Sequence, residues 1–431
     1  MRQAVDSKAD SSDGGGIPGF LLNLAASVAT FIYTTGFLFF RIPEVILLVA
    51  FYPLQSFSAF IGYVIMKQSS LLGRASRRIF HFISLFGIVY LVDHHIPKPL
   101  PAPDASFAGK TVVITGANSG VGFETARQLA VDYGMNVVLG CRSKAKCDAA
   151  AKIINDEVAS SKSPAISMKM RATPLIVDLA EFASVNSFVS QLQGMGIDIL
   201  FNNAGFVPEP NMPVNQYGLD PSFTSMHLSH FLLTEELLKQ NPSMRVVNTS
   251  SGTHHLCAIP FVAPDFIRRT LPLEQNPGCI DEDFLQTKIK TETDSAAYIQ
   301  AKLANVMHVV EIPRHHPQST SVAIDLGWVG THIQPFMDGT LSPTNLGWMR
   351  SASVGVLPVL HAILSSDEEL MEGLDRQWTD GGILMNVFGR SEEPFSQPWW
   401  SERVNLGKSR MLDLSLELWN ASKTLIQKYS N

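Results

Sequence analysis

The 431-residue sequence has few cysteines and few charged residues, and each shortage excludes a class of protein. Only four cysteines occur and none forms a Cys-x-x-Cys motif, so we expect neither a disulfide framework nor a zinc site. This cysteine usage is compatible with a reducing compartment, and Cys141 is expected to be a small buried hydrophobic residue. Lys and Arg (33) do not outnumber Asp and Glu (39), so the sequence lacks the basic excess that would indicate nucleic-acid binding. With 17% charged and 45% hydrophobic residues, the composition favours a membrane-associated protein.

The N-terminal region contains two long uncharged runs. Residues 1–16 are polar and predicted to be disordered, and they lack the basic start of a cleaved signal peptide. Residues 17–40 and 45–66 carry no charge, and each is long enough to cross a bilayer, which takes roughly 20 residues. The short connector contains Pro43, which favours a helical membrane hairpin. The alternative is a pair of buried soluble helices, which would need a polar face.

The segments after this hairpin set the expected membrane topology. Four basic residues follow the second run: Lys67, Arg74, Arg77 and Arg78. They should lie on the cytoplasmic side, and a third apolar run at 79–92 is interpreted as interfacial or re-entrant. If residues 79–92 instead span the membrane, everything after them lies on the opposite side. Residues 17–92 are thus the predicted anchor region, 93–107 a proline-rich linker and 108–431 a folded domain.

From residue 108 onward the sequence alternates between strand-like and helical patterns. Strands are predicted at 111–115, 136–141, 173–178, 197–202, 244–250, 320–326 and 382–386, with helical stretches between them. This alternation predicts an α/β fold of the Rossmann type, with a doubly wound parallel sheet of about seven strands and helices on both faces.

A glycine-rich turn follows the first of these strands and opens a helix. The turn, Thr115 to Gly122, reads Thr-Gly-Ala-Asn-Ser-Gly-Val-Gly. Gly116 allows a tight turn, Gly120 lets backbone N–H groups approach a pyrophosphate, and Gly122 lets the helix pack on the strand. The helix N-terminus adds partial positive charge. The predicted phosphate-binding residues are Gly116, Asn118, Ser119, Gly120, Val121 and Gly122.

Three further motifs follow in order, and together with the glycine loop they carry a family resemblance. They are Asn202-Asn203-Ala204-Gly205 after one apolar run, Ser250-Ser251 after another, and Tyr298-Ile299-Gln300-Ala301-Lys302. This set resembles the short-chain dehydrogenase/reductase family, over roughly residues 108 to 425. Phe231-Leu232-Leu233-Thr234 and Lys302-Leu303-Ala304-Asn305-Val306 are similar to its retinol-dehydrogenase-like branch. The resemblance implies a nicotinamide-dependent oxidoreductase, and the two uncharged runs predict a membrane anchor before it.

The end of the second strand indicates which nicotinamide coenzyme is bound. An NAD-preferring enzyme places a carboxylate about 20 residues after the glycine loop, but this chain has Cys141 and Arg142 there. A guanidinium pairs well with a 2′-phosphate, so NADP(H) is expected, the alternative being that Arg142 is a solvated helix-start cation. The resemblance implies that Asp178 contacts the adenine ring. It also implies coenzyme contacts for Asn203, Ala204, Gly205 and Thr331, although Asn203 could serve only to stabilise the sheet.

Tyr298 and Lys302 are spaced for proton transfer. Four residues apart on a helix, they share one face. A free tyrosine titrates near pH 10, and an adjacent ammonium is expected to lower that pKa toward working pH. By the resemblance, Tyr298 exchanges a proton with the substrate oxygen, Lys302 holds the nicotinamide ribose, and Ser251 hydrogen-bonds the substrate oxygen. The alternative is that Tyr298 and Lys302 form an ordinary surface pair.

The sequence departs from the family pattern at Met226. The family's catalytic Asn, which holds a water in the proton relay, should fall five residues before Phe231, where this chain has Met226. A thioether is a weak acceptor and donates nothing. Another group therefore supplies the water site, or proton exchange is slow, or the protein has drifted toward binding. Asp325-Leu326-Gly327 also departs, because the family has Pro before that Gly.

Four histidines lie near these motifs: His227, His230, His254 and His255. Their spacing matches no metal site, so we expect core or pocket-rim roles and no metal. Residues 260–291 are expected to form a surface excursion near the substrate entrance.

Two hypotheses follow for function. The first is a membrane-anchored, NADP(H)-dependent oxidoreductase that interconverts a lipophilic carbonyl and alcohol of retinoid, steroid or fatty-aldehyde type. Its partners would be that substrate, the membrane and possible further copies of the chain, without nucleic acid. The second is a nucleotide-binding sensor or assembly protein of the same fold with little or no turnover. The expected location is an endoplasmic-reticulum or lipid-droplet type membrane, with the catalytic domain in the cytosol.

Overall fold

The computed structural model describes most of the predicted folded domain. The described residues are 100–103, 106–160, 172–208, 212–254, 280, 297–327, 329–330, 351–372, 374, 382–386, 391–395 and 408–430. All of them belong to one compact unit, Ile96–Asn431. The predicted membrane segments at 17–40, 45–66 and 79–92 lie outside the described residues, as does the excursion at 260–291 apart from Ile280. Among the helices that could be described, none is long and apolar enough to cross a membrane.

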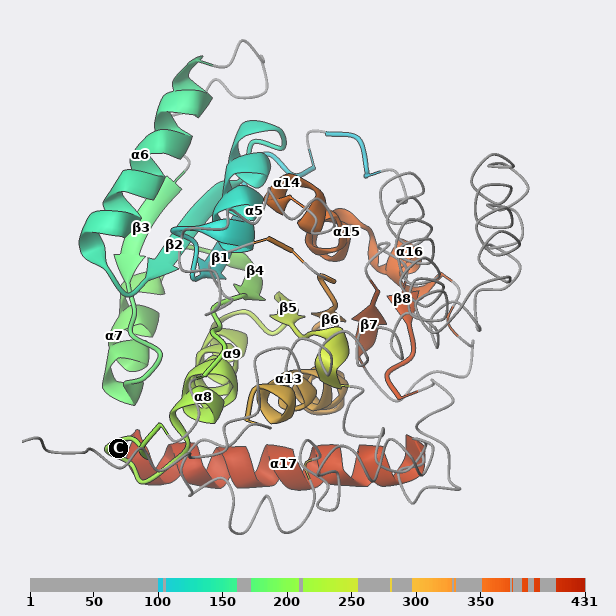
Figure 1. Cartoon of the computed structure of the whole chain (residues 1–431). Helices are drawn as coiled ribbons and strands as arrows, with labels where there is room; N and C mark the ends of the chain where they lie inside the picture. Colours follow the sequence, from blue (N-terminus) through green and yellow to red (C-terminus); the bar gives the residue numbers. More distant parts are fainter. Residues whose placement is uncertain are drawn as a thin grey trace, which may run out of the picture. The chain divides into compact units, whose positions relative to one another are not determined.

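An eight-stranded sheet forms the centre of the domain (Figure 1). Its strands are β1 (Thr111–Thr115), β2 (Asn136–Cys141), β3 (Ala172–Ile176), β4 (Ile197–Asn202), β5 (Arg245–Thr249), β6 (Ser321–Ile324), β7 (Ile383–Met385) and β8 (Ser391–Glu392). Their order is β3-β2-β1-β4-β5-β6-β7-β8, and all neighbours are parallel except β7 and β8. The seven predicted strands are therefore confirmed, and the short antiparallel β8 is the addition.

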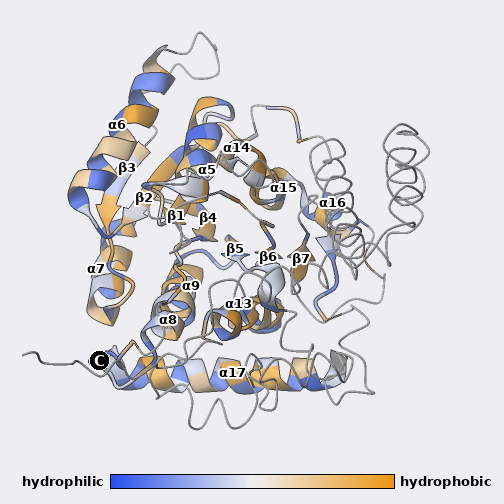
Figure 2. Ribbon diagram, in the orientation of Figure 1, coloured by the Kyte–Doolittle hydropathy of each residue, from blue (hydrophilic) through white to orange (hydrophobic). Residues whose placement is uncertain are grey.

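Helices cover both faces of this sheet. They are α5 (Gly120–Val131), α6 (Lys144–Ser160), α7 (Phe182–Leu192), α8 (Pro221–Phe223), the π-helix η2 (Thr224–Leu228), α9 (Ser229–Gln240), α13 (Ala297–His315), α14 (Ala352–Gly355), α15 (Leu357–Leu364), α16 (Asp367–Met371) and α17 (Lys408–Tyr429). Helices α5, α14 and α15 lie on one face, and α9, α13 and α17 on the other (Figure 1). Their apolar residues (orange in Figure 2) alternate with polar ones along each helix, as expected for helices that cover a sheet.

The first strand, β1, is apolar along its centre because both faces of the sheet are buried there. In β1, Val113 packs into the core cluster that includes α7 and α9 residues, whereas Val112 and Ile114 pack into the cluster on the opposite face. All three side chains are fully buried. A continuous run of β-branched residues is the pattern expected for such a strand. The predicted α/β class is thus confirmed.

The strand order reverses between β1 and β4, which places a crevice at the carboxyl ends of these strands. The chain continues from β1 into Gly116, from β4 into Asn203 and from β5 into Ser250. Because parallel strands present their carboxyl ends on one edge of the sheet, residues from three distant parts of the sequence meet there. The fold therefore positions the site at this edge.

One expectation about the cysteines is wrong. Cys141 and Cys147 form a disulfide between the end of β2 and the start of α6, with Cα atoms 5.8 Å apart. The two residues are only six apart, but the turn between strand and helix brings their Cα atoms within disulfide range without a Cys-x-x-Cys motif. Cys141 is buried, as expected. Cys257 and Cys279 lie outside the described residues.

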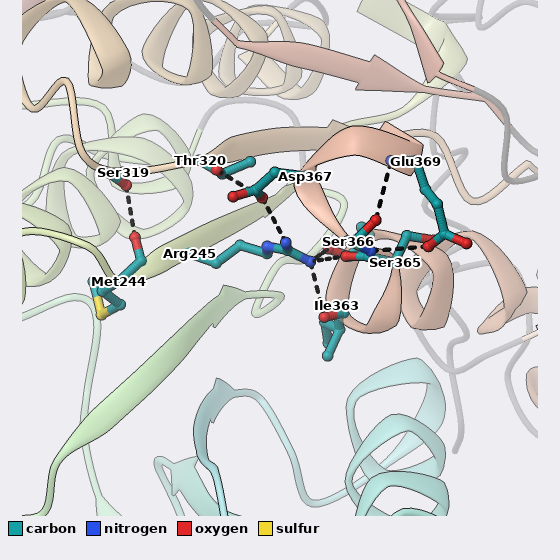
Figure 3. Close-up of polar contacts among 10 residues, drawn as sticks. Met244, Arg245, Ser319, Thr320, Ile363, Ser365, Ser366, Asp367 and Glu369 are labelled. Atoms are coloured by element: carbon teal, nitrogen blue, oxygen red, sulfur yellow. Dashed lines mark hydrogen bonds and ion pairs between the residues drawn. The ribbon is translucent and has the colours of Figure 1, made fainter. Parts of the chain in front are cut away.

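Arg245, at the start of β5, anchors the end of helix α15 at the edge of the sheet opposite the crevice (Figure 3). Its Nη1 donates to the backbone oxygens of Ala362 (3.2 Å), Ile363 (3.0 Å) and Ser365 (2.6 Å). Its Nη2 donates to Asp367 Oδ1 at 2.6 Å. The cation therefore satisfies carbonyl groups that have no partner within the helix and also lies at the favourable end of the helix dipole.

Replacing Arg245 with Ala should lower the free energy of unfolding by about 2–3 kcal/mol, because charge-assisted bonds to half-buried carbonyl groups are lost. Asp367→Asn is the matched control: Asp367 is 66% exposed and Arg245 only 16%, so losing this ion pair should cost less than about 1 kcal/mol. Chemical denaturation of the two variants measures the difference. Equal losses would show that the carbonyl contacts do not matter.

Candidate active site

Three glycines of the loop after β1 are required either by their backbone conformation or by lack of space for a side chain. Gly116 has φ +67° and Gly120 has φ +57°, values that favour glycine. A Cβ added to Gly122 would lie 2.5 Å from Asn203 Nδ2 and 2.6 Å from the Gly116 oxygen. The α5 helix therefore begins in close contact with the turn after β4. The first-turn N–H groups of α5 have no partner within the helix, and phosphate binding by them stays a prediction.

Thr115 joins the glycine loop to the turn after β4. Its Oγ1 accepts hydrogen bonds from the backbone N–H groups of Asn203 and Ala204, both at 3.0 Å. Because a hydroxyl has one proton, that proton goes to its third partner, His230 Nε2, at 2.9 Å. His230 Nδ1 then donates to the Met226 oxygen at 3.0 Å. This arrangement requires neutral His230, and its burial lowers its pKa to about 4.

The Asn203 side chain also joins the turn after β4 to the glycine loop. Its Nδ2 donates to the Thr115 oxygen at 2.8 Å. The alternative that Asn203 stabilises the sheet is therefore supported by a direct hydrogen bond. Ala204 packs closely beneath Gly116, with 3.0 Å between its Cα and the position of an added Cβ. Sequence reasoning missed the hydrogen bond between Thr115 and His230, although Thr115 stands at the start of the glycine motif.

Tyr298, Lys302 and Ser251 come together at the carboxyl end of β5. Tyr298 and Lys302 lie one turn apart on α13, and the Lys302 Nζ lies 5.5 Å from the centroid of the Tyr298 ring. The Tyr298 hydroxyl is hydrogen-bonded to the Ser251 side chain. Lys302 is only 1% exposed, and its Nζ donates to the Thr249 oxygen at 3.2 Å. The structure thus assembles the three predicted catalytic residues and rules out an exposed surface pair.

Burial dominates the electrostatics of this group. It raises the pKa of Tyr298 to about 12, more than the hydrogen bond from Ser251 lowers it. Burial also lowers the pKa of Lys302 to about 8. In the protein without coenzyme the pKa of Tyr298 is therefore raised, not lowered as expected, because desolvation of the phenolate outweighs the hydrogen bond from Ser251. At neutral pH Tyr298 carries its proton.

Met226 lies beside this group, fully buried in η2. A Cβ added to Gly205 would lie 3.3 Å from both the Met226 Sδ and the Lys302 Nζ, so the thioether and the ammonium flank the same glycine. The departure noted in the sequence thus falls beside Lys302. The Met226 side chain has no group that could donate a hydrogen bond to a water beside Lys302. Its backbone carbonyl oxygen already accepts a hydrogen bond from His230.

The other predicted coenzyme residues are distributed along the same edge. Arg142 follows β2, is exposed, and pairs with no carboxylate in the described parts of the chain. Asp178 lies just beyond β3, and its Oδ1 accepts from the Ala180 backbone N–H at 3.0 Å. Asn118 and Ser119 lie in the turn before α5, with Ser119 exposed. Thr331 lies outside the described residues.

Buried histidines surround the site on the α9 and α13 side. His227, His230 and His254 are each 1% exposed, and His308 joins them at 2%. Their roles in the core agree with the expectation, whereas His255 lies outside the described residues. His227 Nε2 is bonded to Ser422 Oγ on α17 at 2.9 Å. The histidines therefore tie the π-helix beside Lys302 to the C-terminal helix.

Comparison with known proteins identifies the class. The family model described as short chain dehydrogenase matches residues 110–261. Human "Retinol dehydrogenase 13" is 32% identical over 337 residues, covering 74% of this chain and 91% of that protein. The mouse "Retinol dehydrogenase 13" is 31% identical, covering 67% of this chain and 80% of its own length. The chain belongs to the short-chain dehydrogenase family, and it is an oxidoreductase of that family.

Solved structures also resemble this chain. An uncharacterized protein from Mycobacterium paratuberculosis aligns with a TM-score of 0.49 and 27% identity, covering 76% of this chain and 96% of that one. A short-chain dehydrogenase from Sphingobium yanoikuyae in complex with NADPH aligns with a TM-score of 0.42 and 20% identity, covering 59% and 84%.

Proposed function

We propose that the protein is a membrane-anchored oxidoreductase that interconverts a lipophilic carbonyl and alcohol, with Tyr298, Lys302 and Ser251 as its catalytic residues. The observation that carries this proposal is the Tyr298 hydroxyl, hydrogen-bonded to Ser251 with the Lys302 ammonium near its ring, beside the glycine loop. Retinoids, steroids and fatty aldehydes are the substrate types that fit. The relatives named as retinol dehydrogenases favour this class.

The residues of the site divide the chemistry among them. When bound, NADP(H) supplies or accepts hydride at the nicotinamide C4. The Tyr298 hydroxyl donates its proton to the carbonyl oxygen during reduction, and its pKa of about 12 keeps that proton in place at neutral pH. Ser251 donates a hydrogen bond to the same oxygen and stabilises its developing negative charge. The Lys302 ammonium holds the nicotinamide ribose and favours the phenolate that remains.

The loops at the crevice fit the coenzyme. The glycine loop after β1 leaves no space for a Cβ at Gly122, and the N-terminus of α5 provides hydrogen-bond donors for a pyrophosphate. We infer that Gly116, Gly120 and Gly122 hold the pyrophosphate and that Arg142 pairs with the 2′-phosphate. Asp178, Ala204 and Gly205 would contact the adenosine, and Thr331 the carboxamide.

Replacing Arg142 with Asp should invert the coenzyme preference from NADPH to NADH, because a carboxylate repels the 2′-phosphate and accepts from a 2′-hydroxyl. Dissociation constants from coenzyme fluorescence measure the two affinities. Lys152→Asp, a charge reversal at an exposed position farther along α6, is the control and should leave the ratio unchanged. An unchanged ratio in Arg142→Asp would mean that the 2′-phosphate is bound elsewhere.

The apolar segments at 17–40 and 45–66 support the lipophilic substrate class, because a membrane anchor collects substrates that partition into the bilayer. Purified protein incubated with NADPH and a lipid extract should convert specific aldehydes or ketones to alcohols, detected by mass spectrometry. Conversion of only water-soluble carbonyls would contradict this substrate class.

The anchor itself should be a hairpin, with residues 79–92 along the surface and the catalytic domain facing the cytosol. Protease added to intact microsomes should then digest the catalytic domain and also remove an N-terminal tag. Protection of the domain with loss of the tag would show that residues 79–92 span the membrane and that the active site faces the lumen.

A second function is favoured by one observation, the buried Met226 beside Lys302. Without a side-chain donor at this position, proton exchange with Lys302 would be slow, and the protein would act as a nucleotide-binding sensor. Tight NADPH binding without turnover on any carbonyl would support that function. Restored turnover in Met226→Asn would show that the methionine is the cause.

A further inference from the structure

The turn between β2 and α6 is closed by a disulfide and carries the coenzyme-binding cation. Cys141 is the last residue of β2, and Cys147 lies in the first turn of α6. Their side chains are buried, at 2% and 0% exposure. The residues between them are exposed and include Arg142 and Lys144. The ring formed by the disulfide therefore contains the loop that we assign to the 2′-phosphate.

We propose that Cys141 and Cys147 are a reversible redox pair whose oxidation state sets the affinity of this loop for NADPH. The inference rests on the proposed function in one respect, the pairing of Arg142 with the 2′-phosphate. The existence of the redox pair itself does not depend on that assignment.

The chemistry is a thiol–disulfide exchange. Both sulfurs are buried, so the exposed loop at 142–146 must first open locally and expose one of them. The thiolate of that cysteine then attacks a low-molecular-weight disulfide such as oxidised glutathione, forming a mixed disulfide and releasing one glutathione thiolate. The second cysteine, as its thiolate, displaces the other glutathione, so the Cys141–Cys147 bond forms. The two cysteine thiols lose two electrons and two protons, and two glutathione thiols are produced. A dithiol reductant reverses the reaction.

Reduction must move one end of the turn. Bonded sulfurs lie about 2.05 Å apart, whereas non-bonded heavy atoms need roughly 3.5–4 Å. The β2 end is held on both sides, because Cys141 is in register with Ile176 of β3, and Gly140 with Thr115 of β1. The displacement therefore falls on the start of α6 and on the loop residues Arg142 and Ser143.

The direction of the effect follows from preorganisation. In the oxidised ring, Arg142 is tied to two fixed ends, so less conformational freedom is lost when it pairs with a phosphate. In the reduced form the loop can shift, and the same pairing costs more. NADH has no 2′-phosphate, so its affinity should be nearly independent of the redox state.

The test uses the full-length protein, with Cys257 and Cys279 replaced by Ser so that only this pair can react. It is equilibrated with oxidised glutathione or with dithiothreitol, and differential thiol labelling followed by mass spectrometry gives the state of the pair. Trypsin cuts after Arg142, Lys144 and Lys146, so the oxidised form yields two peptides joined by the disulfide. Dissociation constants for NADPH and NADH are measured in both states.

We expect the dithiol to reduce the pair and to weaken NADPH binding by about threefold or more, with NADH binding changed by less than about twofold. Cys147→Ser should bind NADPH as weakly as the reduced form does, and its NADPH affinity should be the same after oxidised glutathione as after dithiothreitol. A pair that stays reduced with oxidised glutathione, or stays oxidised with dithiothreitol, overturns the proposal. A pair that cycles without changing the NADPH-to-NADH ratio also overturns it, provided that Arg142→Ala lowers NADPH affinity. If Arg142→Ala has no effect, the assignment of the 2′-phosphate fails instead.

Discussion

Tyr298→Phe should reduce turnover at least about a hundredfold while leaving NADPH affinity nearly unchanged. The substitution removes only the hydroxyl, so the ring keeps its place 5.5 Å from the Lys302 Nζ. The lost group is the proton donor to the substrate oxygen and the partner of Ser251. Steady-state NADPH oxidation together with a coenzyme-binding titration separates the chemical step from binding.

Tyr133→Phe is the matched control for this experiment. Its hydroxyl donates to the Pro101 oxygen at 3.0 Å, at the far end of α5 from the glycine loop. Turnover should therefore remain normal in this variant. If Tyr298→Phe retains more than about a hundredth of the rate, another residue must supply the proton.

Mild acid should destabilise the folded domain strongly, because histidines are buried in their neutral form. Burial lowers the pKa of His227 to about 3 and of His230 to about 4, and it holds the pKa of His308 well below its ordinary value. In the unfolded chain these groups titrate near pH 6.5 and bind protons that the folded state excludes. Stability is therefore present above pH 6.5 and lost as the pH falls toward the folded values.

The expected loss between pH 7 and pH 5.5 is about 1.2 kcal/mol per histidine, or roughly 4 kcal/mol for the three. Most carboxylates remain ionised in this range, so histidine protonation dominates. His308→Asn is the matched variant: its side chain can still bond Asn248, the partner of His308 Nδ1 at 3.2 Å, but it cannot titrate. Burial also lowers the pKa of His254, which adds to the wild-type loss. Denaturation curves against pH should therefore show a loss of stability that is smaller by about 1.2 kcal/mol in the variant than in the wild type. If the stability of both proteins fell equally with pH, the pKa of His308 would not be lowered in the folded state.

The sequence predicts the sheet well because its central strands are buried on both faces and end at a glycine or a polar turn. Val112, Val113 and Ile114 show this pattern before Gly116. The antiparallel strand β8 could not be predicted, because Ser391–Glu392 is too short to show a period. The grouping of Ser251, Tyr298 and Lys302 was predictable because these residues stand in motifs of fixed spacing.

What the sequence could not predict depends on contacts between distant residues. Thr115 and His230 are bonded although they lie far apart in the chain, and neither stands out by residue type. The direction of the Tyr298 pKa shift could not be predicted either, since it depends on how burial compares with the hydrogen bond from Ser251. The Cys141–Cys147 pair depends on the path of the turn after β2.

The most direct test of the central claim follows hydrogen transfer itself. Wild-type protein is incubated with NADPH deuterated at the nicotinamide C4 and a lipophilic aldehyde that it reduces, and the alcohol is analysed by mass spectrometry. NADPH deuterated in turn on each face of C4 covers both possible orientations. We expect one deuterium on the carbinol carbon from one of the two forms, and no product from Tyr298→Phe. Bound NADPH with no deuterated alcohol from any carbonyl tested would contradict an oxidoreductase function.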